Sequence, residues 1–254
     1  KRQAQACDVP VVAGLSEAIS IEQAQAFFAA HADSGILLKA IAGGGGRGMR
    51  IVRSADELVD AFTRCQSEAL AAFGNDGLYA EQLVASPRHI EGQIIGDGSG
   101  AVSHIWEREC SLQRRHQKLV EIAPSPTLDP AIRDAMCAAA VRLGQEINYA
   151  GLGTIEFLLD TNANEFFFIE ANARLQVEHT VTEEVTGIDL VRAQIEVAGG
   201  ASLNDLGLQQ AGVPDPRGYA IQLRVNMETM TAEGDVMPAG GRLSKFEVPT
   251  GPGL

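Results

Sequence analysis

Two carboxylates in the middle of the chain, Glu156 and Glu170, are placed to bind a divalent metal ion. They lie in two alternating segments, 153–159 and 165–170, and the turn-forming run between the segments favours a hairpin. A tight hairpin can bring both carboxylates to one face, and Mg²⁺ takes hard oxygen ligands such as carboxylates together with nucleotide phosphates. Asn172 follows two residues later. Carboxylates on a hairpin surface are also common without a metal. The pattern therefore suggests a metal site and leaves open that both are ordinary surface carboxylates.

A second set of polar groups follows the hairpin directly. Arg174, Gln176 and Glu178 alternate with Leu175 and Val177, so an extended segment would present the three polar side chains on one side. A guanidinium, an amide and a carboxylate on one face suit a small planar oxyanion with a base beside it. A half-buried strand with a polar outer face would show the same alternation.

A glycine run near the start of the chain is a candidate phosphate site. Gly43 to Gly46 are followed by Arg47 and Gly48, and Lys39 precedes them. Consecutive glycines permit positive φ and let backbone N–H groups close over an anion, which a nearby Lys can also contact. The Gly-Lys-Ser/Thr ending and the following helix of a Walker loop are missing. A flexible hairpin with an exposed Lys explains these residues equally well.

The segment from Gln113 to Lys118 is a local basic cluster, with three cations and a histidine in six residues. Such clusters are usually solvated surfaces. The whole chain has 20 basic and 33 acidic residues, a formal net charge of -13. That balance argues against a nucleic-acid partner, because binding to nucleic-acid phosphates relies on clustered Lys and Arg. In an acidic protein with a glycine loop, the cluster is a candidate site for a small anion.

Composition indicates a soluble protein with a substantial core. With 254 residues, 45% of them hydrophobic, the chain can form one large domain or one and a half. No apolar stretch reaches the roughly 18 residues that a membrane span needs, and no signal peptide opens the chain. We therefore expect a cytoplasmic location and no membrane partner. Four scattered cysteines lack metal-ligand spacing, and we expect reduced thiols.

The predicted elements that position these groups alternate without a regular βαβ order. A capping box at Ser54 to Glu57 opens a helix that extends to about Phe73. Helices are predicted at 21–32, 54–73, 129–148 and 182–198. Strands are predicted at 35–41, 49–52, 78–84, 89–96, 153–159, 165–170, 219–226 and 243–248, and a further strand after the turn at 97–100 ends at Trp106. The antiparallel hairpins favour a mixed α+β protein.

Taken together and in this order, these segments resemble the biotin carboxylases of the ATP-grasp superfamily. The resemblance covers most of the chain, from Val9 nearly to the end. The glycine run to Met49 and the paired metal carboxylates are shared by many ATP-grasp ligases. The Arg-Arg-His-Gln-Lys run before Leu119 and the Arg-x-Gln-Val-Glu-His run ending at His179 are narrower signals. Carbamoyl phosphate synthetase, the nearest competitor, has a different sequence after its metal Asn.

The resemblance implies an ATP-grasp fold, in which two α+β subdomains grip ATP. Residues 1–205 would form the ATP-grasp domain, with a mobile lid subdomain at 40–100. Residues 206–254 would begin a truncated C-terminal domain. The family's N-terminal domain, and a stretch with another ATP-contacting Lys, would be missing, so we interpret the sequence as a fragment of a longer polypeptide.

The resemblance also implies a role for each matching residue. Lys39 would contact the ATP phosphates, while Glu81, Gln82 and Val84 would form the hinge beside adenine, with Leu158 packed on its ring. The other nucleotide-binding positions would be Gly44, Gly45, Gly46, Met49, His89, Gln113 and His116. The metal ligands would be Glu156, Glu170 and Asn172, and the bicarbonate site would comprise Lys118, Arg174, Gln176, Val177 and Glu178. Arg224 matches an Arg that faces biotin.

The implied reaction uses ATP, Mg²⁺ or Mn²⁺, bicarbonate and biotin. Glu178 would deprotonate bicarbonate, which would then attack the γ-phosphate of ATP. The resulting carboxyphosphate would decompose to CO₂ and phosphate, the phosphate would take a proton from biotin, and Arg224 would stabilise the biotin enolate. A closing glycine lid would protect the unstable intermediate from water.

The resemblance also implies partners. No Met-Lys-Met biotinylation site occurs, so biotin would arrive on another domain or subunit. Biotin carboxyl carrier and carboxyltransferase domains or subunits are therefore expected, within an oligomeric parent. Met227-Glu228-Thr229 hints at an acyl-CoA carboxylase. The alternatives are a pyruvate or urea carboxylase, another ATP-grasp carbon–nitrogen ligase, or a truncated nucleotide-binding module without turnover.

Overall fold

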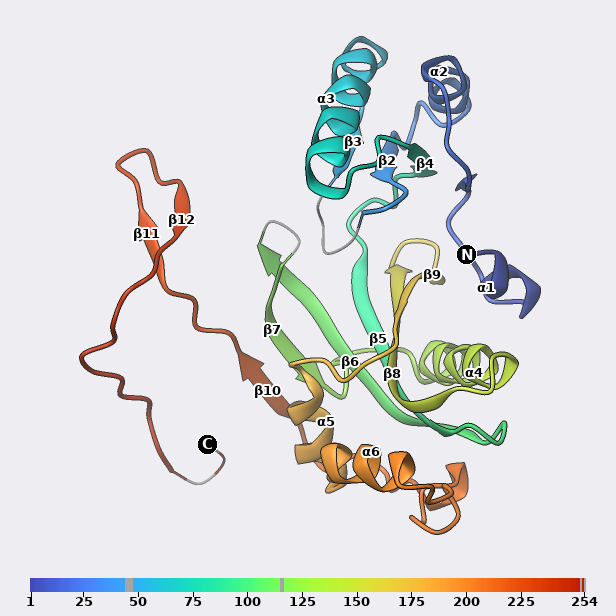
Figure 1. The fold of residues 1–254 in the computed structure, drawn as a ribbon, viewed down its shortest axis with the longest axis vertical. Coiled ribbons are helices and arrows are strands. Elements are labelled where there is room, and N and C mark those ends of the chain that lie inside the picture. Colours follow the sequence, from blue (N-terminus) through green and yellow to red (C-terminus); the bar gives the residue numbers. More distant parts are fainter. Residues whose placement is uncertain (44–47, 115–116, 252, 254) are drawn as a thin grey trace. The chain divides into compact units, whose positions relative to one another are not determined.

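The computed structural model describes residues 1–43, 48–114, 117–251 and 253. By its internal contacts the chain divides into two compact units, Lys1–Leu223 and Arg224–Leu254. Helices and antiparallel sheets make up the first unit (Figure 1), which confirms the predicted α+β class. The expected domain bounds, 1–205 and 206–254, stay a prediction, as does the mobile lid at 40–100. Among the described helices, none is long and apolar enough to cross a membrane.

The larger sheet has six strands and carries most of the candidate site residues. In spatial order they are β10 (Ala220–Leu223), β7 (Gln117–Ala123), β6 (Val102–Arg114), β5 (Arg88–Asp97), β8 (Ala150–Asp160) and β9 (Glu165–Asn172). Helix α4 (Pro130–Glu146) packs on one face through a core that includes Ile90, Ile94 and Phe157. Helices α5 (His179–Thr186) and α6 (Leu190–Ala198) pack on the other face, where Ile95 and Ile105 contribute to a second core. Figure 1 shows α4 apart from α5 and α6 across this sheet.

The smaller sheet has the order β1 (Gly14–Leu15), β4 (Leu78–Gln82), β2 (Ile36–Ala40) and β3 (Met49–Val52). Alternate residues of β2, from Ile36 to Ala40, point into a core with α2 (Ile21–Ala30) and α3 (Ala55–Phe73). That alternation leaves Lys39 on the opposite face of the sheet. The predicted capping box is present, because the Glu57 carboxylate accepts the Ser54 backbone N–H at 2.9 Å.

Three predicted elements differ from the structure. The strand expected to end at Trp106 continues as β6 to Arg114. The helix expected at 182–198 is two helices, because Gly187 adopts φ +75° and ends α5, and the Asp189 side chain then caps α6. The strand expected at 243–248 is wrong: these described residues contain no strand, and their apolar side chains are exposed. The second unit instead has a two-stranded sheet of β11 (Glu228–Met230) and β12 (Val236–Pro238).

Two short elements complete the description. Helix α1 (Arg2–Ala6) opens the chain, and a single 3₁₀ turn, η1 (Gln210–Gly212), precedes β10. The strand predicted at 219–226 is confirmed with shorter bounds, since β10 pairs with β7. Strand β7 itself was not predicted from the sequence, where its first residues were considered only as part of the basic cluster.

Candidate active site

Three neighbouring strands bring carboxylates together on one face of the larger sheet. The predicted hairpin is present as β8 and β9, and Glu156 lies opposite Glu170 across it. On the other side of β8, Glu91 of β5 lies opposite Glu156. Because Ile90 and Ile94 face the α4 core, strand alternation directs Glu91 to the face that α5 covers. Antiparallel register therefore builds an acidic row from residues far apart in sequence.

Lys118 on β7 is the cation at the centre of this row. Its Nζ lies 2.5 Å from Glu91 Oε2, 2.6 Å from Glu178 Oε1 and 3.0 Å from Glu156 Oε1. Burial alone would lower the pKa of Lys118, but the surrounding carboxylates raise it well above its ordinary value. Lys118 is therefore a fixed positive charge, with only 11% of its side chain exposed.

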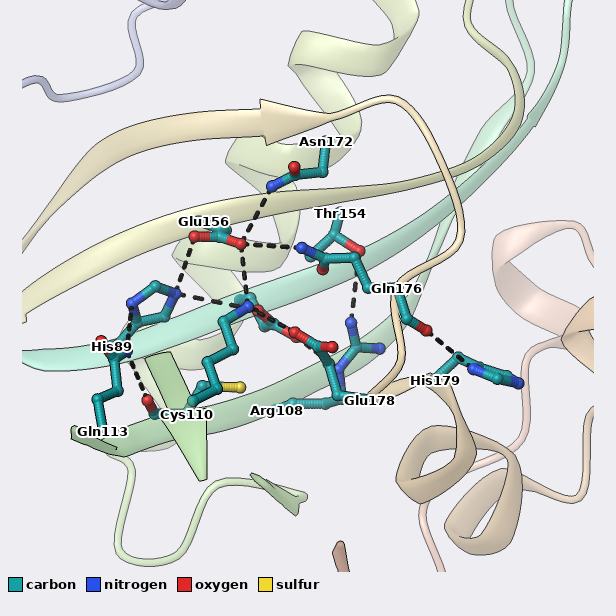
Figure 2. A network of polar contacts seen from close by, with 12 residues as sticks. His89, Arg108, Cys110, Gln113, Thr154, Glu156, Asn172, Gln176, Glu178 and His179 are labelled. Carbon is teal, nitrogen blue, oxygen red and sulfur yellow. Dashed lines mark hydrogen bonds and ion pairs between the residues drawn. The ribbon is translucent and has the colours of Figure 1, made fainter. Parts of the chain in front are cut away.

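Glu156 accepts hydrogen bonds from three donors and also pairs with His89 (Figure 2). Its Oε1 lies 3.0 Å from Lys118 Nζ, 3.1 Å from Asn172 Nδ2 and 3.0 Å from Gln176 Nε2, and its Oε2 lies 3.0 Å from His89 Nε2. Burial alone would raise the pKa of Glu156, but His89 and Lys118 hold it well below its ordinary value. The group is thus an ionised carboxylate, and a metal ion bound there would replace part of these donors.

The other two expected metal ligands lie beside it. Asn172 Nδ2 lies 3.3 Å from Glu170 Oε1 as well as close to Glu156, so one amide spans both carboxylates. Glu170 is exposed, and Asn172 is half-buried. Two carboxylates and an amide are the hard donors that Mg²⁺ takes, so the residues present fit such an ion.

The segment after β9 places two of its three polar side chains in the site. It is a loop ending in a turn, not an extended strand, yet Gln176 and Glu178 are both buried while Val177 is 62% exposed. Gln176 Oε1 is buried, and no donor within the described residues faces it, so it can accept a ligand O–H. Arg174 is exposed, and its guanidinium donates to the Leu175 carbonyl at 3.2 Å.

Glu178 is held as an anion by neighbouring cations. Burial alone would raise the pKa of Glu178, but Lys118, and to a smaller extent Arg108, lower it. An ionised, 2% exposed carboxylate beside a fixed ammonium can accept a proton from a bound group.

A separate ion cluster lies on the smaller sheet. Glu81 Oε2 is 2.6 Å from Lys39 Nζ, and its Oε1 is 2.5 Å from Lys1 Nζ. Burial alone would raise the pKa of Glu81, but the two lysines lower it. Gln82 ends β4 and donates its backbone N–H to Ala13 O at 2.8 Å, and Val84 lies in the connection to β5. The expected adenine hinge thus joins the two sheets.

The remaining expected residues occupy several places. His89 Nδ1 lies 3.1 Å from Gln113 Nε2, which also donates to the Cys110 carbonyl (Figure 2). Leu158 pairs with His89 across β5 and β8, and Met49 pairs with Lys39 across β2 and β3. Arg224 belongs to the second unit. Gly44, Gly45, Gly46 and His116 lie outside the described residues.

Three buried residues of the site were missed from the sequence: Glu91, Arg108 and Cys110. Glu91 and Arg108 are fully buried and joined by a 2.7 Å ion pair. Burial raises the pKa of the Cys110 thiol well above its ordinary value, so it stays protonated. The sequence did contain one signal for Glu91: a charged residue between Ile90 and Gly92, within a predicted strand, is a candidate for a buried functional group.

Comparison with known proteins places this site in a family. The model of the carbamoyl-phosphate synthase L chain, ATP binding domain, matches residues 1–206. The chain is 49% identical over 254 residues to a biotin carboxylase of Nostoc sp., and 47% identical over 252 residues to a pyruvate carboxylase of Bacillus subtilis. These matches cover 100% and 97% of this chain. The chain spans 55% of the length of the first relative and 21% of the second.

A solved structure agrees with the sequence relatives. The biotin carboxylase domain of Hydrogenobacter thermophilus 2-oxoglutarate carboxylase, in complex with MgADP, ADP and bicarbonate, superposes with a TM-score of 0.90 at 40% identity. The match covers 99% of this chain and 54% of that one. The fold is therefore an ATP-grasp fold, as predicted. The chain belongs to the family of carbamoyl-phosphate synthase L chain ATP binding domains, and within it to the biotin carboxylase ATP-grasp domains.

Proposed function

We propose that this chain performs the biotin carboxylase half-reaction, in which ATP and bicarbonate carboxylate biotin. The observation that carries the proposal is the buried cluster of Lys118 with Glu91, Glu156 and Glu178, next to Gln176 Oε1, which has no hydrogen-bond partner among the described residues. A fixed cation, an ionised base and an acceptor that the described residues leave unpaired, all on one face, suit a small oxyanion that carries one proton. The complex of the 2-oxoglutarate carboxylase domain with MgADP and bicarbonate supports this assignment.

Metal binding is assigned to Glu156, Glu170 and Asn172. When bound, Mg²⁺ or Mn²⁺ would supply positive charge to the nucleotide phosphates during transfer. The low pKa of Glu156 keeps its carboxylate ionised for this purpose.

The chain's own residues handle bicarbonate. Lys118 and Gln176 bind and orient it, with Arg174 and the Val177 backbone at the rim, and Glu178 accepts its proton at a carboxylate oxygen. The deprotonated oxygen then attacks the γ-phosphate, forming an O–P bond as the bond to ADP breaks. Charge that develops at the phosphoryl group faces Lys118 and Lys39.

Nucleotide binding is assigned to both sheets. Lys39 contacts the phosphates while Glu81 holds its ammonium in place, and Val84 and its neighbours contact adenine. His89 and Gln113 hold the polar end of the nucleotide, and Leu158 packs on the base. The glycine lid and His116 complete this proposal. Arg224 is assigned to the negative oxygen that develops on biotin.

The parent enzyme is a biotin-dependent carboxylase with carrier and carboxyltransferase parts. Met227-Glu228-Thr229 favours an acyl-CoA carboxylase, whereas several relatives, including the one from Bacillus subtilis, are pyruvate carboxylases. The acceptor is identified by presenting acetyl-CoA, propionyl-CoA and pyruvate to the intact parent and measuring ADP release with each.

The half-reaction is tested by ADP release from the intact parent polypeptide with Mg-ATP and bicarbonate. Free biotin should stimulate the release, because biotin accepts the activated carboxyl group and so allows a further turnover. Stimulation by ammonia or an amine in place of biotin would indicate another ATP-grasp ligase. Nucleotide binding without release under any of these conditions would indicate a module without turnover.

A further inference from the structure

Arg108 is the largest fully buried side chain described, and it lies behind the proposed site. Its Nε lies 2.7 Å from Glu91 Oε1, and its Nη1 lies 2.7 Å from Gln93 Oε1 and 3.0 Å from Thr182 Oγ1. Its Nη2 lies 3.4 Å from Thr154 Oγ1. One guanidinium thus connects β5, β6, β8 and helix α5, and Figure 2 shows its contact with Thr154 of β8. A rigid planar fork with several donors is suited to this task, and an ammonium is not.

A β-bulge sets the direction in which Arg108 points. Between β5 and β6 the pairing passes from Gly92 with Glu107 to Ile94 with His104, so two residues of β6 oppose one of β5. One of the two, Trp106, adopts φ +59°, an uncommon conformation for a bulky residue. The extra residue reverses the alternation of the strand.

The reversal puts an apolar and a charged residue on the same face. Ile105 lies in the core with α6, and three positions later Arg108 also faces α5 and α6. Glu107 faces α4 instead, where its carboxylate pairs with Arg133 Nε at 2.9 Å. Without the bulge, Glu107 and not Arg108 would face the site.

Glu91 connects Arg108 to Lys118. Its Oε1 accepts from Arg108, and its Oε2 accepts from Lys118 at 2.5 Å. Glu91 and Arg108 are both fully buried, so contacts at both oxygens hold this carboxylate in one orientation. The positive charge of Arg108 also balances the negative charge of Glu91. The ammonium of Lys118 can therefore pair with Glu156 and Glu178 as well as with Glu91.

We propose that Arg108 is a positioning residue which, through Glu91, holds Lys118 between Glu156 and Glu178. The catalytic meaning of this role rests on the proposed function, but the positioning itself does not. A purely structural role for Arg108 would stabilise the sheet without affecting Lys118. The two roles therefore make different predictions for the strand that carries Lys118.

Matched variants separate these roles in the intact polypeptide. Thr182→Val removes one Arg108 contact and keeps the side-chain shape, and Arg108→Lys keeps the charge without the fork. Thr186→Val is the control, since this buried threonine lies one turn later on α5 and donates to the Thr182 carbonyl at 2.7 Å, away from Arg108. Each variant is made alone and together with Lys118→Met.

The first measurement is hydrogen exchange, followed by mass spectrometry of peptides that cover β7. We expect Thr182→Val and Arg108→Lys to raise β7 exchange by about threefold or more, because the opening equilibrium of this strand includes the Lys118 contacts. In the Lys118→Met background that increase should disappear. An increase that persists unchanged in that background, or that equals the effect of Thr186→Val, would overturn the proposal.

The second measurement is biotin-stimulated ADP release. Thr182→Val should lower kcat by about tenfold with the ATP KM changed by less than about twofold, and Thr186→Val should leave both unchanged. Equal kcat values for the two variants would also contradict the proposal. If the unmodified protein shows no biotin-stimulated release, the proposed function has failed, and the exchange measurement still decides whether Arg108 positions Lys118.

Discussion

Replacing Lys118 by Met should destabilise the larger sheet in a pH-dependent way. The substitution keeps much of the side-chain volume but removes the charge that contacts Glu91, Glu156 and Glu178 at 2.5–3.0 Å. Removing one partner of a buried ion pair costs about 3–5 kcal/mol. Since three carboxylates lose their cation here, we expect about 4 kcal/mol of local stability to be lost at pH 7.

The sign of the pH dependence follows from the carboxylates. Glu156 and Glu178 have folded-state pKa values below their ordinary value of 4.5, so their stabilisation is present above that value and is lost as the pH falls through the folded pKa. In Lys118→Met these pKa values rise, and the folded variant binds protons at a higher pH. Its deficit should therefore shrink towards acidic pH, by about 1.4 kcal/mol per pH unit for each proton taken up.

Native-state hydrogen exchange of β7 and β8 amides measures this deficit. The ratio of variant to unmodified exchange at each pH removes the intrinsic pH dependence of exchange. The ratio should be largest near pH 7 and should fall below pH 5. A ratio that is independent of pH, or that grows towards acid, would refute the assignment of Lys118 as the counter-ion of buried, ionised carboxylates.

Three further substitutions test individual site residues. Glu178→Gln should lower biotin-dependent ADP release by about 100-fold or more while far-UV circular dichroism is unchanged, because an amide cannot accept the proton; retained turnover would eliminate Glu178 as the base. Glu156→Gln should raise the Mg²⁺ concentration for half-maximal activity by about tenfold or more in a metal titration, and an unchanged titration would remove it from the metal site. Glu81→Gln should raise the ATP KM about threefold or more, with a smaller effect on kcat, because Lys39 loses its counter-ion; an unchanged KM would show that this pair does not position Lys39.

Local patterns in the sequence predicted the local parts of the structure. The hairpin with Glu156 and Glu170 could be predicted because alternation and a turn-forming run are both short-range signals. The capping box at Ser54 could be predicted for the same reason. The break at Gly187 was missed because a single glycine within a helical pattern is often tolerated.

The buried half of the site depends on long-range register, which one sequence does not reveal. Glu91 reaches Lys118 only because β5 and β7 lie on either side of β6 in the larger sheet. Arg108 faces that pair only because of the bulge at Trp106, whose left-handed conformation has no strong sequence signal for a bulky residue. The expected strand at 243–248 was wrong for a related reason, because its apolar residues are exposed and pair with no other strand among the described residues.

The central claim is that this site transfers a carboxyl group from bicarbonate to biotin. The direct measurement supplies the intact polypeptide with radiolabelled bicarbonate, Mg-ATP and free biotin, and quantifies acid-labile label on biotin together with ADP. The account predicts labelled carboxybiotin in a one-to-one ratio with the biotin-stimulated ADP, and about 100-fold less of both products from Glu178→Gln. ADP that forms without label on biotin would contradict it.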